Sequence, residues 1–124
     1  VTDLKKSMDF YTAIGFTNNP QFTDETAACM VLSEEIYVML LTHQKLATFT
    51  NKEIINAKKY AGAINSISVD SLDEANTMAD NAIKNGGIEP TPPQDYGFMQ
   101  QRSFEDLDGH HWEVIYMDMS KLPQ

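Results

Sequence analysis

The sequence predicts an α+β fold made of two tandem βαβββ modules. A helical apolar pattern occurs in each half, about three short strands follow each helix, and the halves align at an offset of 68, with Val1-Thr2-Asp3-Leu4 over Val69-Asp70-Ser71-Leu72. In this alignment Val1 ends a first strand that is largely missing from the given chain. We expect one domain over residues 1–124, with module one at about 1–42, a linker at about 43–61 and module two at about 62–119.

Module one is predicted to begin with a helix and to continue as a hairpin. The helix has apolar residues at helical spacing between an N-cap at Asp3 and a C-cap at Gly15; these are Leu4, Met8, Tyr11 and Ile14. The apolar runs Ala27–Leu32 and Ile36–Leu41 predict two paired strands. The mixed, polar linker that follows predicts at most a short helix near Glu53–Lys58.

Module two is predicted to begin with a strand over Ala63–Val69. Ser71 and Glu74 form a capping-box pattern at the start of a helix that Gly86 ends. Two further strands, Phe98–Glu105 and His111–Met117, are joined by the turn sequence Asp106-Leu107-Asp108-Gly109.

Composition excludes several classes of protein. The 124 residues are 42% hydrophobic, which fills a core without a disulfide framework, and the single cysteine, Cys29, has no intramolecular partner. The longest apolar run, Ile36–Leu41, is too short to cross a bilayer. A net charge of -9 disfavours nucleic acid and anionic membranes as partners. We expect a cytoplasmic protein.

Three motifs together resemble the vicinal oxygen chelate superfamily, which includes glyoxalases and bleomycin-resistance proteins. They are the stretch from Val1 to Phe16, with its V-x-D-L, S, F-Y and G-F pattern, the module-two entry at 68–71, and the closing hairpin at 104–113, where Leu107 replaces the usual proline. The resemblance implies paired βαβββ modules whose curved sheets surround a cavity for a small organic molecule. It also implies a homodimer, because family members commonly pair modules across subunits.

The resemblance implies metal ligands on the first and last strand of each module, and this chain matches only one of them. Glu113 occupies the closing-strand position, whereas Ile64 stands at the module-two opening position and Ile36–Leu41 offers no acid, amide or imidazole. His110 and His111 are consecutive, so on a strand they point to opposite faces and cannot chelate one ion. We therefore expect no bound metal or other cofactor.

Three functions remain open at this point. The first is a small-molecule-binding protein of unassigned reaction that lacks the family metal set. The second is a metal-dependent lyase or isomerase of glyoxalase I type, with one divalent ion at Glu113, which would act as ligand or base. The third is a regulatory protein that uses the fold as a scaffold. Whether the protein is an enzyme is left undecided.

The register of the closing hairpin predicts the candidate site. An even-numbered loop at 106–109 would place Arg102 opposite Glu113 on one face, as a partner for its carboxylate. We take Glu113 as the catalytic candidate and six residues as substrate-binding candidates: Arg102, Gln100, Phe98, His111, Tyr37 and Met39. The alternative is an exposed Arg102–Glu113 ion pair of little energetic value.

Overall fold

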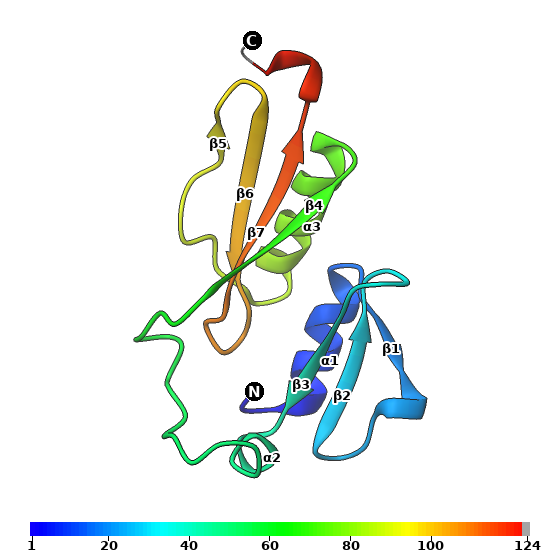
Figure 1. Ribbon diagram of the computed structural model, residues 1–124, viewed down its shortest axis with the longest axis vertical. Coiled ribbons are helices and arrows are strands. Elements are labelled where there is room, and N and C mark those ends of the chain that lie inside the picture. Colours follow the sequence, from blue (N-terminus) through cyan, green and yellow to red (C-terminus); the bar gives the residue numbers. More distant parts are fainter. Residues whose placement is uncertain (123–124) are drawn as a thin grey trace.

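The computed structural model describes residues 1–122, which form two open β-sheets with one long helix packed on each (Figure 1). The N-terminal sheet has the strand order β1-β2-β3, and the C-terminal sheet has the order β4-β7-β6-β5. The predicted α+β fold is confirmed, although the two sheets stay separate and do not close around a cavity.

The N-terminal half consists of helix α1 (Leu4–Ala13) and a meander of three strands, β1 (Thr17–Asn19), β2 (Ala27–Val31) and β3 (Tyr37–Leu41). A 3₁₀ turn, η1 (Pro20–Phe22), joins the first two strands. The carboxylate of Asp3 accepts the amide of Lys6 at 3.0 Å, which caps α1 as predicted. Gly15 reverses the chain after the helix with a φ of 115°, a value that favours glycine.

The C-terminal half contains all five elements of a βαβββ module. These are β4 (Ile64–Val69), α3 (Leu72–Lys84), β5 (Gln94–Asp95), β6 (Met99–Glu105) and β7 (His111–Met117), followed by the 3₁₀ turn η2 (Met119–Lys121). Ser71 caps α3 as predicted by accepting the amide of Glu74 at 3.1 Å. The Glu74 carboxylate reaches back to the amide of Asp70 at 2.8 Å, one residue before the N-cap amide that a capping box would use. Strand β4 pairs in parallel with β7, and α3 belongs to the long connection that a parallel pair requires.

The linker differs from its prediction. Its helix is α2 (His43–Leu46), capped by the hydroxyl of Thr42, and residues 53–58 are not helical. Thr42 accepts the amide of Lys45 at 3.1 Å, so the helix begins where a capping hydroxyl is available. The composition of residues 53–58 gave no comparable start signal.

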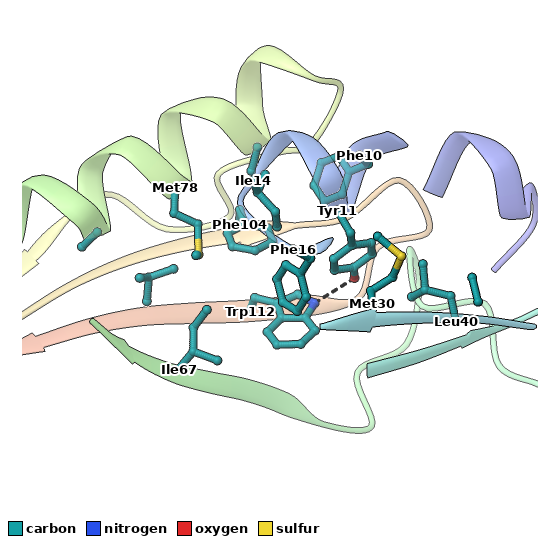
Figure 2. Packing of buried hydrophobic residues seen from close by; sticks show 14 residues of the cluster. Phe10, Tyr11, Ile14, Phe16, Met30, Leu40, Ile67, Met78, Phe104 and Trp112 are labelled. Atoms are coloured by element: carbon teal, nitrogen blue, oxygen red, sulfur yellow. Dashed lines mark hydrogen bonds between the residues drawn. The ribbon is translucent and has the colours of Figure 1, made fainter. Parts of the chain in front are cut away.

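One hydrophobic core joins the two halves. Figure 2 shows Tyr11 and Phe16 from the N-terminal half packed against Phe104 and Trp112 from the C-terminal half. The rings of Tyr11 and Trp112 meet edge to face with centroids 6.0 Å apart, and those of Phe104 and Trp112 stack at 6.3 Å. Aromatic pairs of this kind each add about 0.5–1.5 kcal/mol beyond the area that they bury. The two halves therefore share one hydrophobic core.

Both long helices lie on the same side of the strands (Figure 2). Met30 and Leu40 point toward α1, and Trp112 and Val114 of β7 belong to the same core. Side chains alternate along a strand, so the residues between these core positions point to the opposite face of each sheet. Among the described residues, no long helix covers that face. Large apolar side chains stay exposed on these open faces, namely Tyr37, Met39, Ile64 and Met117.

Candidate functional site

Glu113 lies in the middle of β7 and projects from the open face of the C-terminal sheet. Its neighbours Trp112 and Val114 are buried on the helix side, so alternation turns Glu113 the other way. The neighbouring strand β4 places Ser66 level with it, and the Ser66 hydroxyl donates to the Glu113 carboxylate at 3.2 Å. One carboxylate with a hydroxyl partner therefore stands on a sheet face that the chain leaves uncovered.

Apolar side chains from β4 and β7 border this pair. Ile115 and Met117 follow Glu113 at two-residue spacing along β7, and Ile64 precedes Ser66 in the same way along β4. Ile64 is 54% exposed and Met117 47% exposed, so this apolar surface is open to a ligand. Ser103 faces Glu113 from β6, but it is buried and shares a 2.8 Å hydrogen bond with the hydroxyl of Thr91.

The predicted pairing of Arg102 with Glu113 is wrong by one residue. Arg102 lies opposite Val114, and Ser103 lies opposite Glu113. The loop contains five residues, 106–110, because Gly109 adopts a φ of 93° after the turn and adds one residue before the ladder resumes at His111. A shift of one residue moves a side chain to the opposite face.

Arg102 therefore points toward α3, where it holds the sheet to the helix. Its guanidinium donates to Glu89 at 2.7 Å, to Asn76 at 2.9 Å and to Asp80 at 2.9 Å. Burial alone would lower the pKa of Arg102, but the bonds and charges of Asp80 and Glu89 outweigh burial and raise it. Both interpretations of an Arg102–Glu113 pair, in a cavity or in solvent, are excluded by this geometry.

The other substrate-binding candidates do not share one cavity. Gln100 lies on the Arg102 side and lines a cavity of about 190 Å³ beside α3, and Phe98 lies half-buried just before β6. His111 shares the open face with Glu113, two residues away. Tyr37 and Met39 lie on the open face of the N-terminal sheet, where they are 64% and 40% exposed.

Within residues 1–122, no group of three or more metal-ligating side chains comes together. Beside Glu113 on β4 stand Ser66 and, two positions before it, Ile64, which do not supply the imidazole that the family ligand set requires. His111 is the nearest imidazole along the strand, about 7 Å from Glu113 by strand geometry. The donor set at Glu113 therefore does not fit the family's metal ion.

Sequence reasoning missed Ser66 as a partner of Glu113. The register between β4 and β7 places these two residues side by side. No local sequence motif predicts the register of a parallel strand pair. The internal repeat predicted strand β4 and its end at Val69. It did not predict which residues of β7 lie beside those of β4. In the described part of the chain, no helix is long and apolar enough to cross a membrane.

Comparisons with known proteins agree with this architecture. The family model of the Glyoxalase/Bleomycin resistance protein/Dioxygenase superfamily matches residues 1–114. Hypothetical protein SA1046 from S. aureus is 24% identical with a TM-score of 0.79, over 94% of this chain and 87% of its own. A family enzyme from Burkholderia phytofirmans PsJN is 15% identical with a TM-score of 0.74, over 94% of this chain and 92% of its own.

A third solved structure, the fosfomycin resistance protein FosX from Mesorhizobium loti, is 16% identical with a TM-score of 0.68, over 97% of this chain and 87% of its own. No curated protein sequence matches the chain. At these identities the solved structures establish the fold alone, whereas the family model covers most of the chain. The chain therefore belongs to the glyoxalase/bleomycin resistance protein/dioxygenase superfamily.

Proposed function

We propose that this protein is a cytoplasmic small-molecule-binding member of its superfamily that uses Glu113 without a metal ion. The observation that carries the proposal is the Ser66–Glu113 hydrogen bond on an open sheet face bordered by exposed apolar side chains. Ligand sites commonly combine an apolar surface with a few polar groups that fix orientation.

The chemistry of the pair limits the ligand class. An ionised carboxylate accepts hydrogen bonds and donates none. The Ser66 hydroxyl uses one lone pair of one Glu113 oxygen. The remaining lone pairs suit a donor such as an amine, amide or hydroxyl. Ile64, Ile115 and Met117 would contact an apolar body, and the flexible methionine side chain adapts to different shapes. We therefore propose an organic ligand with a hydrogen-bond donor beside an apolar group.

Tyr37, Met39 and His111 remain candidates for contact with the same ligand. Tyr37 and Met39 belong to the other sheet, on the face that alternation turns away from α1, and both long helices lie on one side of the strands (Figure 2). A second copy of the chain would complete the site if it laid its N-terminal sheet over the C-terminal sheet of the first. We propose a homodimer for this reason, and Arg102, Gln100 and Phe98 have no part in the site.

The proposal is tested by a ligand screen with the purified protein and three variants. Hits are ranked by the rise in Tm and then titrated by calorimetry. Glu113→Gln keeps the shape but removes the charge, and Ser66→Ala removes the partner. We expect Glu113→Gln to weaken a genuine ligand by about tenfold or more, since charge-assisted hydrogen bonds contribute about 1.5–3 kcal/mol.

The matched control is Glu25→Gln, the same change at an exposed position in the loop before β2, which should leave affinity unaltered. Hits that bind the Glu113→Gln protein as tightly as the wild type would contradict the proposal. A metal-dependent lyase is the competing function, and it requires a divalent ion bound through Glu113.

A further inference from the structure

Positive charge is concentrated in one stretch of this acidic protein. Residues 36–69 contain four lysines, at 45, 52, 58 and 59, and a single acid, Glu53. The remaining residues carry five basic and seventeen acidic side chains. A local cationic region on a chain of net charge -9 is available to attract an anion.

The same stretch lines a cavity. This cavity has a volume of about 670 Å³ and lies between the linker, the N-terminal segment and the β6–β7 hairpin. Such a volume is typical of small-molecule sites. Side chains that carry or can acquire positive charge line it from three segments: His43, Lys52, Lys58 and His110.

Two carboxylates, Glu53 and Asp108, also line the cavity, and the amide and hydroxyl of Thr2 donate to that of Asp108 at 2.9 and 2.5 Å. The excess of positive charge comes from the linker as a whole, whose four lysines outnumber its single acid, Glu53. The four ion pairs within residues 1–122 involve Lys5, Arg102 and Lys121, so the ammonium groups of Lys52 and Lys58 are unpaired there.

The cavity wall is held in a fixed shape by the close approach of the linker to the hairpin. Gly109 has a φ of 93°, and a Cβ at this position would come within 2.7 Å of the Lys58 backbone nitrogen. Asn56 accepts the Lys58 amide through its side chain at 3.1 Å and the Tyr60 amide through its carbonyl at 3.0 Å. This turn orders the backbone around Lys58 before any ligand binds.

From this combination we propose that the cavity between linker and hairpin binds a small organic anion. Lys52 and Lys58 would neutralise its charge from the linker, and His43 and His110 would donate hydrogen bonds from α2 and the hairpin. Leu46, Ile54 and Ile55 line the same cavity and would contact the carbon skeleton of the ligand. This site is separate from the open face that carries Glu113.

Phosphate and carboxylate ligands share this chemistry, so the experiment uses one probe of each kind. Inorganic pyrophosphate and citrate are titrated separately into ¹⁵N-labelled protein at low salt, where screening is weak. We expect saturable shifts of the amide signals of His43, Lys52, Lys58 and His110, with no shift at Ser66 or Glu113. A response to one probe only assigns the ligand to that class.

Variants separate the site from general charge attraction. The double change Lys52→Gln with Lys58→Gln should weaken binding by about tenfold, or about 1.4 kcal/mol, whereas Lys84→Gln with Lys121→Gln, of equal net charge, should stay within about twofold. Glu113→Gln should bind the probes like the wild type, so the two sites fail or succeed independently. The proposal is overturned if neither probe gives saturable shifts at the cavity, or if both double variants lose affinity equally.

Discussion

The hydroxyl of Tyr11 on α1 donates a 2.5 Å hydrogen bond to the carboxylate of Asp106, 95 positions later in the β6–β7 hairpin. The same oxygen accepts the indole N–H of Trp112 at 3.0 Å. Burial, followed by the charge of Asp106 and the hydrogen bond to it, raises the pKa of Tyr11. The hydroxyl therefore keeps the proton that Asp106 accepts, and the two halves are tied together inside the core.

Tyr11→Phe should destabilise the protein, because it leaves Oδ2 of the buried Asp106 carboxylate and the Trp112 indole N–H without their hydrogen-bond partner. Oδ1 of Asp106 keeps the amides of Asp108 and His110. We expect the free energy of unfolding to fall by about 1–3 kcal/mol, as measured by urea denaturation. Tyr37→Phe is the control, since its ring is 64% exposed. Equal losses in the two variants would contradict a structural role for the Tyr11 hydroxyl.

Arg102→Ala should remove three hydrogen bonds that join β6 to α3 and to Glu89. Because Asp80 stays 67% exposed, we expect a loss of about 2–3 kcal/mol, below the roughly 3–5 kcal/mol of a fully buried pair. Arg102→Lys keeps the charge but loses the planar fork, so its loss should be intermediate. Lys5→Ala, which breaks only the exposed pair with Asp9, should cost under about 1 kcal/mol.

The pH dependence of stability should report the hydrogen bonds of Asp108. Partial burial raises the pKa of its carboxyl, but the bonds from Thr2 outweigh burial and lower it below its ordinary value. Its stabilising contribution is therefore complete above about pH 5 and is lost as the pH falls through the unfolded value of about 3.9 toward the lower folded value.

Acid unfolding of Asp108→Asn, followed by circular dichroism, should accordingly depend less steeply on pH than that of the wild type. Thr2→Val retains the amide donor and removes the hydroxyl, so it should give an intermediate slope. An Asp108→Asn protein with the wild-type pH profile would show that the carboxylate contributes nothing to the folded state.

We expect the purified protein to hold no stoichiometric divalent ion at Glu113, since Ser66 and Ile64 stand where β4 would have to supply a ligand. Elemental analysis measures this directly, and treatment with a chelator should leave Tm unchanged. About one equivalent of nickel, zinc, iron or manganese, lost in Glu113→Gln, would support the lyase function instead.

A homodimer is the assembly that we expect, because both open sheet faces expose large apolar side chains on one side of the chain. Light scattering should give twice the 14.0 kDa chain mass. Met117→Lys would place a charge on this surface and should shift the equilibrium toward the monomer. A monomeric mass at high micromolar concentration would count against the expected assembly.

The sequence predicted most of the fold because its signals are local. Asp3 and Ser71 mark helix starts through contacts with residues a few positions away, and these contacts form as expected. The C-cap of α1 is Ile14, one residue before the predicted Gly15. The offset of 68 residues exposed the repeat without any knowledge of long-range contacts. The family model then matched the same order of elements over residues 1–114.

The candidate site was predicted less well because it depends on register. Glu113 was identified on its own strand, but its neighbours depend on whether the hairpin loop contains four residues or five. The φ of Gly109 decides that number, and the motif at 106–109 is compatible with either. Ser66 and the cavity beside Lys58 depend on contacts between segments far apart in the sequence, which composition does not encode.

The two faces of the C-terminal sheet have different roles, and this difference affects how the protein can change through evolution. Arg102 and the aromatic core stabilise one face, whereas Glu113 and its neighbours on the other face contribute few contacts to the core. Mutations on the open face should therefore lower the free energy of unfolding less than mutations that change binding usually do. A scaffold arranged in this way can acquire new ligands by substitutions that selection for folding barely opposes.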